Sequence, residues 1–414
     1  MVGLVAGGLA VAAADALVLV KDHRIVRLAT ARSLRRGRKG GRFGRTTGHD
    51  ARTGCAQQGA ENAAEEPAAA EAPAEAPAEQ PAEEAAAATV FPLTVKDQLG
   101  NEVTLEHAAE RIVSGYYISS STCIALGLKD KLVATEEKID KRPIYKLAAP
   151  ELIGNVGNVG SAKAFDLEAC IAAEPDLVIL PKKAKDYAAT LTEMGIPAIV
   201  VNPESHEKLV EMVNLIAQLT GAEEKAKALT ARYDEVMKKV EGLTANIADA
   251  DKPTVYMCGT SSYLTTAPKD MYQASIVTSA GGKNAGDSLE GDSWTDISYE
   301  QLIAMNPDVI IIPTNNMANG QPDFTADEVM SDEQLKEVAA VKNGAVYNMP
   351  TGFEAWDSPV PSGVLGMLWM TAKLHPEVYT MEEFAADAAD FYKTFYGFDM
   401  DTSSILGETV EKAA

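Results

Sequence analysis

The sequence predicts an α/β protein with two similar lobes, mostly parallel sheets, a long rigid α-helix joining the lobes, and a ligand cleft between them. From residue 89 onward, short β-branched runs alternate with turn residues and helical patterns. A helix, turn and strand motif occurs twice, and a long helical pattern lies between the two copies. Apolar runs that do not alternate with polar residues indicate strands buried on both faces, as in parallel sheets covered by helices.

Length and composition argue against several classes of protein. The 414 residues are 46% apolar and 23% charged, which is enough to bury a core in each of two domains. The net charge of −23 would repel a phosphate backbone, so no nucleic acid is expected as a partner. The four cysteines include no Cys-x-x-Cys pair, which argues against structural zinc, an iron-sulfur cluster or a disulfide-rich module.

The first 88 residues differ in character from the rest of the chain. Residues 1–54 are basic, and we expect either a leader or a misassigned start, because the basic residues follow the apolar run 2–20 instead of preceding it. Residues 55–88 consist mainly of Ala, Glu and Pro and are predicted to be a disordered tether. Gly54-Cys55 resembles the start of a mature bacterial lipoprotein, which implies a lipid anchor at Cys55 and attachment to the membrane surface. Arg52-Thr53 depart from that pattern, and the alternative is an ordinary exposed thiol.

Six strands are predicted in the two lobes. We expect an N-terminal lobe over 89–203, a C-terminal lobe with terminal helices over 250–398, and a tail over 399–414. The predicted strands are 111–114 (RIVS), 177–180 (LVIL), 198–201 (AIVV), 254–257 (TVYM), 309–312 (VIII) and 345–348 (AVYN).

The repeated motif indicates that the lobes share one Rossmann-like architecture. Residues 166–181 (DLEACIAAEPDLVILP) and 298–313 (SYEQLIAMNPDVIIIP) share seven identities, which include Glu168 with Glu300 and the Pro-Asp turn. Between the lobes, 204–249 is predicted to be a helical linker. It carries one apolar stripe that ends at Gly221 and a second from Ala226 to Ile247. A helix over the second stripe would measure ~37 Å at ~1.5 Å per residue, so we expect the lobes to rock only slightly.

Over residues 92–395 the chain resembles the helical-backbone class of substrate-binding proteins, which serve bacterial ABC importers of ferric siderophores, haem and vitamin B12. The two repeated segments carry the resemblance, followed by FEAWDSPVPSGVLGMLWMTAKLHP near the C-terminus. The resemblance implies an extracytoplasmic receptor, not an enzyme and without a cofactor. It would work as a monomer and deliver a metal chelate, first of all a ferric siderophore, to a dimeric membrane permease. A corrinoid such as cobalamin, haem, and then a molybdate-type oxyanion are the alternative ligands.

Candidate ligand-binding residues follow the strands, because ligands of open parallel sheets bind beyond the carboxyl ends of the strands. Aromatic side chains and lysines gather at these positions and suit a bulky, partly apolar anion. The candidates are Tyr116, Tyr117, Lys163, Phe165, Lys182, Lys183, Tyr263, Trp294, Asn315, Asn316, Phe353 and Trp356. In the vitamin B12 binder of the family, aromatics at positions like Tyr263, Trp294 and Trp356 contact the ligand.

Each candidate also has a purely structural interpretation. Single aromatics after a strand often anchor a loop, lysine runs are usually solvated, and Asn tolerates turns. Asp357 is interpreted as a helix cap. The resemblance implies that Glu168 and Glu300 dock on arginines of the two permease subunits, and the alternative is that each is a surface residue favoured in the first turn of a helix.

The sequence lacks the common catalytic motifs. There is no Gly-x-Ser-x-Gly elbow, no phosphate-binding loop and no His-Glu-x-x-His, and the five histidines are scattered, so no direct metal site is expected. Cys123, Cys170 and Cys258 are predicted to be buried thiols, with a disulfide left open. The alternatives from other classes are a cluster-bearing α/β enzyme and an adhesive surface protein.

Overall fold

The computed structural model describes residues 89–291, 293–313, 323–350 and 352–410. The predicted leader 1–54, the tether 55–88 with Cys55, and Asn315 and Asn316 lie outside these residues. No helix within the described ranges is both long enough and apolar enough to cross a bilayer.

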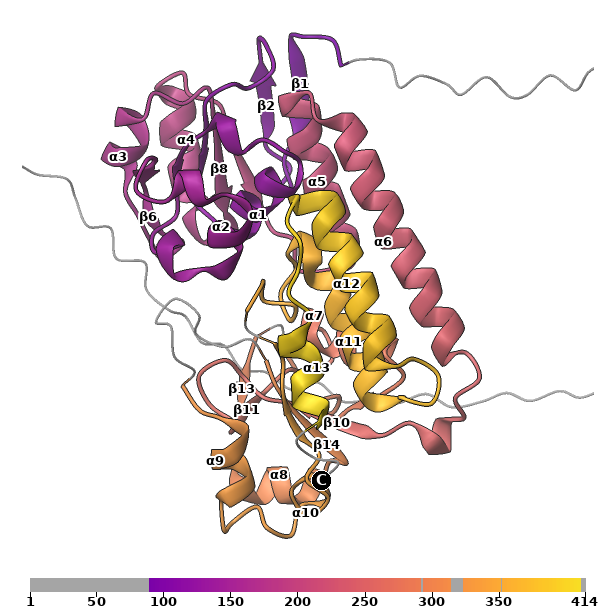
Figure 1. Cartoon of the computed structure of the whole chain (residues 1–414). Coiled ribbons are helices and arrows are strands. Elements are labelled where there is room, and N and C mark those ends of the chain that lie inside the picture. The colour runs from indigo at the N-terminus through magenta and orange to yellow at the C-terminus, as the bar shows by residue number, and fades with distance from the viewer. Residues whose placement is uncertain (1–88, 292, 314–322, 351, 411–414) are drawn as a thin grey trace, which may run out of the picture. The chain divides into compact units, whose positions relative to one another are not determined.

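The first lobe, which lies around the labels β8, α3 and α4 in Figure 1, contains a five-stranded parallel sheet. The strand order of this sheet is β5-β4-β3-β8-β9. Its strands are β3 (Ile112–Ser114), β4 (Leu132–Thr135), β5 (Gly157–Asn158), β8 (Leu177–Pro181) and β9 (Ala198–Val201). Two antiparallel pairs accompany it, namely β1 (Leu93–Lys96) with β2 (Glu102–Leu105), and β6 (Gly160–Ser161) with β7 (Ala164–Phe165). The helices are α1 (Tyr117–Ala125), α2 (Pro143–Ala148), α3 (Leu167–Ala172) and α4 (Asp186–Glu193).

The second lobe contains a four-stranded parallel sheet with the order β12-β10-β14-β15. Its strands are β10 (Thr254–Met257), β12 (Lys283–Asn284), β14 (Val309–Ile312) and β15 (Val346–Asn348), and β11 (Thr265–Thr266) pairs with β13 (Thr295–Asp296) beside it. Its helices are α7 (Tyr272–Ser279), α8 (Tyr299–Met305), α9 (Ala326–Ser331) and α10 (Ala339–Lys342). The two parallel sheets confirm the predicted α/β fold class.

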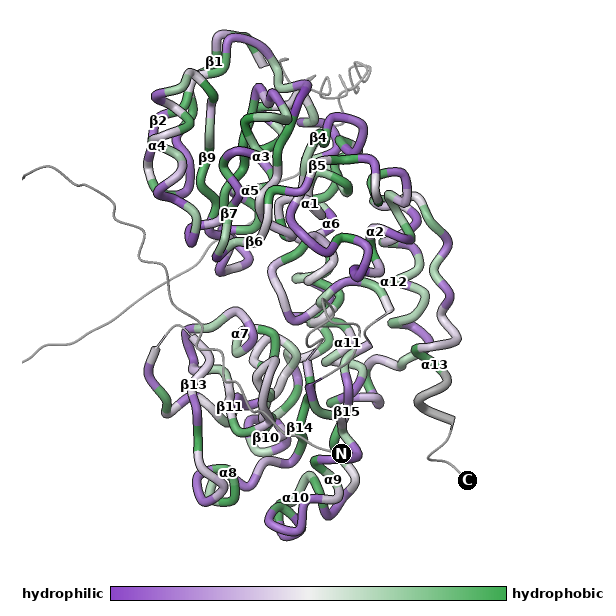
Figure 2. Tube along the Cα trace, turned by 90° about the vertical axis from the view of Figure 1, so that its left-hand side faces the viewer, coloured by the Kyte–Doolittle hydropathy of each residue, from purple (hydrophilic) through white to green (hydrophobic). Residues whose placement is uncertain are grey.

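Strands such as β9 and β14 are apolar along their whole length, as the green tube shows (Figure 2). β9 is buried at every position, and β14 at all but its first, because helices cover the sheets.

Long helices connect the two lobes and pack on each other. α5 (His206–Thr220) ends at Gly221, whose φ of 73° is left-handed and suits glycine, and α6 (Glu223–Thr244) follows. α6 packs against α5 and α11 (Val364–Leu374), and α11 packs against α12 (Met381–Tyr396). α13 (Ser403–Val410) lies within the predicted tail. One hydrophobic cluster includes side chains from both lobes and from these long helices, so the lobes share a core.

The repeated Pro-Asp turn has the same hydrogen-bonding role in both lobes. Asp176 accepts hydrogen bonds from the backbone amides of Glu110 and Arg111, just before β3. Asp308 accepts one from the backbone amide of Thr254, at the start of β10. Each aspartate therefore ties the beginning of its own strand to the beginning of the neighbouring strand, which explains why both copies of the motif contain it.

Candidate functional site

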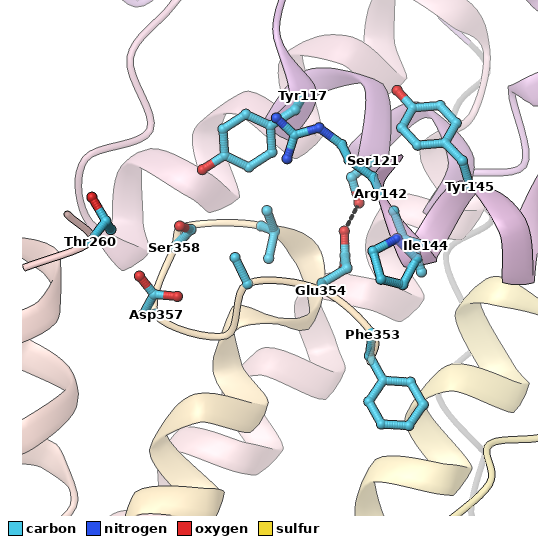
Figure 3. Close-up of a pocket in the computed structure, with 13 residues that line it drawn as sticks. Tyr117, Ser121, Arg142, Ile144, Tyr145, Thr260, Phe353, Glu354, Asp357 and Ser358 are labelled. Atoms are coloured by element: carbon cyan, nitrogen blue, oxygen red, sulfur yellow. Dashed lines mark hydrogen bonds between the residues drawn. The ribbon is translucent and has the colours of Figure 1, made fainter. Parts of the chain in front are cut away.

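A pocket of about 230 Å³ lies between the two lobes, at the carboxyl ends of the strands (Figure 3). The first lobe contributes the start of α1, which follows β3, and the start of α2, which follows β4. The second lobe contributes Thr260 after β10 and the loop 353–360 after β15. The lining residues are Tyr117, Ser121, Arg142, Pro143, Ile144, Tyr145, Thr260, Phe353, Glu354, Ala355, Asp357, Ser358 and Val360.

Arg142 supplies a positive charge to the pocket lining, and it lies directly before α2. The side chain is 25% exposed, and its Cζ lies 4.3 Å from the centroid of the Tyr117 ring, which is a cation–π contact. Its Nε is 3.7 Å from Glu136 Oε1, too far for a hydrogen bond, and this buried Nε has no hydrogen-bond partner among the residues that the structure describes. The guanidinium group therefore has unused donor capacity within the pocket lining.

Glu136 follows β4 and lies next to Arg142, outside the pocket lining. Its carboxyl group is buried and accepts hydrogen bonds from Ser120 Oγ at 2.6 Å and from Tyr145 Oη at 2.9 Å. Burial raises the pKa of Glu136, while the nearby charge of Arg142 acts in the opposite direction. Arg142 therefore lies close to both the carboxyl group of Glu136 and the ring of Tyr117.

The loop 353–360 forms the wall on the second lobe. Glu354 and Asp357 are both buried, and the main-chain oxygen of Asp357 accepts a hydrogen bond from Gln273 at 2.8 Å.

Tyr117, on the first lobe, is a second donor in the pocket lining. Burial is the main cause that raises the pKa of Tyr117, to about 12, so its hydroxyl group remains protonated and can donate. Arginine and tyrosine donors at the edge of an aromatic surface can bind an anionic group of a small ligand.

The structure brings two of the predicted ligand-binding residues to this pocket, Tyr117 and Phe353. The Tyr116 ring lies edge-on to that of Tyr117, with centroids 5.3 Å apart, but does not belong to the lining. Phe353 stacks on Trp356 with an interplanar angle of 3°.

Trp356 does not line the pocket, contrary to the expectation from the sequence. Its side chain is fully buried, and its Nε1 donates a hydrogen bond to Tyr392 Oη at 2.8 Å. The indole points into the layer of long helices because Tyr392 on α12 offers it an acceptor there. Asp357 does not cap a helix as expected, because the 3-10 turn Pro361–Gly363 that leads into α11 has Val360 at its N-cap position. Asp357 lies in the pocket lining instead.

The other predicted aromatics lie within their own lobes. Tyr263 donates a hydrogen bond to Asp332 at 2.9 Å and contacts Tyr299, so it anchors a loop on the second lobe. Phe165 is buried against Tyr187, and Trp294 is half-buried beside β13. The three lysines lie outside the lining: Lys163 is in the β6–β7 turn, and Lys182 and Lys183 follow β8.

Glu168 and Glu300 occupy equivalent positions on the two lobes. Each is the second residue of its helix, α3 or α8, and lies in the first turn. The caps differ in chemistry but act alike: Asp166 accepts from the backbone amide of Ala169, and Ser298 accepts from that of Gln301. Hydrogen bonding at Ser298 lowers the pKa of Glu300.

The residues of the site that were not predicted from the sequence include Arg142, Glu136, Ser121 and Glu354. Arg142 and Glu136 follow β4, whose short sequence LVAT is too weak a signal to predict a strand, so the strand-end rule does not reach the loop after it. The available signal was this short β-branched run before the charged segment 136–142. Ser121 lies within α1 and belongs to the site because α12 and the loop 353–360 approach it.

No group of three or more His, Cys, Asp or Glu side chains is arranged to hold a metal ion in the described ranges. Cys123, Cys170 and Cys258 are free and buried, and burial raises the pKa of each thiol. The disulfide that the sequence left open among these three cysteines is therefore not formed.

Comparison with known proteins identifies relatives of this chain. A family model described as periplasmic binding protein matches residues 112–351. A cobalamin-binding protein of Halobacterium salinarum is 28% identical over 70% of this chain and 76% of its own length. An uncharacterized ABC transporter substrate-binding lipoprotein of Bacillus subtilis is 25% identical over 63% of this chain and 79% of its own length. The structure of a molybdate periplasmic binding protein of Haemophilus influenzae, bound to molybdate, has the same fold, with a TM-score of 0.65 and 19% identity over 75% of this chain and 99% of that one.

Proposed function

We propose that this chain, which belongs to the periplasmic binding protein family, captures an anionic metal compound at Arg142 and delivers it to an ABC importer. The observation that carries the proposal is the guanidinium group of Arg142, which lies in the pocket between the lobes and whose buried Nε has no hydrogen-bond partner within the described part of the chain. Because the side chain is 25% exposed, an anionic ligand in the pocket can accept hydrogen bonds from the accessible part of the guanidinium group and so compensate for the weak pairing at Nε.

Two classes of anionic ligand suit a pocket that carries the positive charge of Arg142. A ferric siderophore or another ferric chelate presents carboxylate or catecholate oxygens to Arg142, and Tyr117 and Phe353 contact its apolar parts. A molybdate-type oxyanion is the second candidate, favoured by the cavity volume of about 230 Å³, which lies below the roughly 300–1,000 Å³ of sites for larger ligands. Haem, cobalamin and a full-sized ferric siderophore are all larger than this cavity, so each of them needs the lobes to move apart. The lysines Lys163, Lys182 and Lys183 would attract an anion toward this acidic protein.

The proposed role is binding and delivery, without catalysis. Family members of this kind are transport proteins, and ATP hydrolysis would be supplied by other subunits of the importer. Glu168 and Glu300 are proposed to dock on the two permease subunits, because equivalent carboxylates on similar lobes can meet a symmetric partner twice. As a periplasmic binding protein the chain acts outside the cytoplasmic membrane. A lipid anchor at Cys55 remains a prediction.

Calorimetric titration of the full chain tests the ligand proposal. The panel consists of molybdate, ferric citrate, ferric catecholate and hydroxamate siderophores, haem and cobalamin. We expect one anionic class to bind and Arg142→Ala to weaken its affinity by about 10–100-fold, since a hydrogen bond to a charged group contributes about 1.5–3 kcal/mol.

Arg232→Ala is the matched control. Arg232 pairs with Asp390 on the long helices, outside the pocket lining, so its removal changes net charge equally without touching the site. Equal affinities of Arg142→Ala and the wild-type chain would refute the assignment of Arg142. Binding of haem or cobalamin alone would refute the proposed ligand classes.

A further inference from the structure

A buried carboxyl group lies in the pocket lining where the two lobes meet. Glu354 is 5% exposed and belongs to the loop between β15 and α11. Its Oε1 lies within hydrogen-bond distance of Ser121 Oγ on α1, in the first lobe (Figure 3). Its Oε2 accepts from Ser362 Oγ, at 2.5 Å, and from Tyr396 Oη on α12, at 2.7 Å. The carboxyl group thus connects the first lobe to the second and to the long helices.

The hydroxyl groups around Glu354 also contact each other. Ser121 Oγ and Tyr396 Oη are 2.9 Å apart, which adds a fourth oxygen–oxygen contact to the three that the carboxyl group makes. Each contact needs one proton, but the hydroxyls of Ser121, Ser362 and Tyr396 supply only one each. If the carboxyl group were ionised, one contact would hold two oxygens face to face without a proton between them.

A protonated carboxyl group supplies the fourth proton. Glu354 Oε1–H then donates to Ser121, Ser121 donates to Tyr396, and Tyr396 donates back to Glu354 Oε2, which closes a ring. Ser362 donates to the same Oε2. Every contact in the cluster is satisfied in this arrangement, as expected for a buried polar network.

The electrostatic surroundings agree with this proton count. Burial raises the pKa of Glu354 and outweighs the hydroxyl donors and the Ser362 backbone amide, which favour the ionised form. The cation of the pocket, Arg142, forms only a long ion pair with Glu136, with 3.7 Å between Nε and Oε1. The titratable or charged groups that face this region are Tyr233 from α6, Tyr392 and Tyr396 from α12, and, in the pocket lining, Tyr117, Arg142, Tyr145 and Asp357.

We infer that Glu354 is a neutral carboxylic acid in the native protein at neutral pH, and that it is a positioning residue that joins the two lobes at the pocket. The effect of this protonation state on ligand capture rests on the proposed function. A neutral Glu354 leaves the charge of Arg142 less opposed, so an anion is favoured, whereas ionisation adds a negative charge to the lining and lowers affinity.

Infrared spectroscopy of the full chain tests the protonation state without any ligand. We expect the wild-type protein at neutral pH to show the carbonyl stretch of a buried carboxylic acid, and Glu354→Gln to lose it. Glutamine keeps one donor and one acceptor at this place, so it can preserve the ring. Glu193→Gln, at an exposed position on α4, is the control and should leave the band unchanged. A wild-type spectrum identical to that of Glu354→Gln would overturn the inference.

A second variant decides the question if Glu354→Gln does not fold. Ser362→Ala removes a donor that favours the ionised carboxylate, so the acid band should persist to higher pH than in the wild type. An unchanged titration of the band would show that it arises from another carboxyl group and would contradict the inference.

The pH dependence of stability gives an independent readout. An unfolded glutamate titrates near pH ~4.3, and the folded-state pKa of Glu354 is higher, so the folded protein retains a proton that the unfolded chain releases. The contribution of Glu354 is therefore fully present below the unfolded pKa and decreases as pH rises toward the folded pKa. Glu354→Gln should remove this decrease, and equal slopes in both proteins would contradict the inference. Failure of every compound in the titration panel would refute the proposed ligands but leave these results intact.

Discussion

Gly366→Ala should destabilise the protein by pushing the pocket loop away from α11. Gly366 lies in the first turn of α11, against the backbone of Trp356. A Cβ atom added there would lie 3.1 Å from the carbonyl carbon of Trp356 and closer still to its oxygen. Both residues are buried, and Trp356 is held by stacking and by its hydrogen bond to Tyr392, so the backbone has little room to move.

The expected magnitude follows from two opposing contributions. Overpacking of a filled core costs about 1–3 kcal/mol, and more when backbone must shift. Alanine gains up to about 1 kcal/mol over glycine from helix propensity. The net effect on the free energy of unfolding is a loss of about 1–2 kcal/mol, and we expect Tm to fall by about 1.5–3 °C in a chain of this size.

Gly242→Ala is the matched control. Gly242 lies in α6 with nothing within 4 Å of the added Cβ, so the same substitution should raise the stability by up to about 1 kcal/mol. Differential scanning calorimetry of the two variants and the wild-type chain measures both changes. The reasoning is refuted if Gly366→Ala has a Tm equal to or above that of the wild type.

Two further predictions concern the pocket loop and the docking surface. Tyr392→Phe leaves the buried Nε1 of Trp356 without its acceptor, so thermal unfolding should show a loss of about 1–3 kcal/mol in the free energy of unfolding. The control Tyr187→Phe should lose less than about 0.5 kcal/mol. Similar losses in the two variants would contradict the role of the hydrogen bond. Glu168→Lys and Glu300→Lys should leave ligand binding unchanged and each lower the ATPase stimulation of a reconstituted importer by about tenfold. Undiminished stimulation in the double variant would disprove docking through these carboxylates.

The architecture could be predicted well because the strongest signals in the sequence come from segments buried on both faces. The runs VIII and AIVV have no polar position and can be accommodated only inside a covered sheet. β4 was missed because LVAT is short and merges into a charged segment, and β5 and β12 because each spans two residues that include glycine or asparagine. Such short strands are defined by pairing with a neighbour, which the local sequence does not encode.

The candidate site could be predicted only in part. The strand-end rule reached Tyr117 and Phe353, which follow recognised strands. It could not show which way Trp356 points, since that direction depends on Tyr392 in a helix later in the chain. Glu354 was missed for the same reason, because its significance lies in the hydroxyls of Ser121 and Tyr396 that the fold brings to it.

The shared core has a consequence for dissecting the molecule into fragments. The cluster that contains Ile112 of the first lobe also contains Val255 of the second and Trp369 of α11. A chain cut after α6 would expose the apolar stripe that α11 normally covers, and the first lobe expressed alone should aggregate or be degraded. Proteolysis experiments should accordingly find either the intact chain from β1 to α12 or small peptides, with no stable single-lobe product between them.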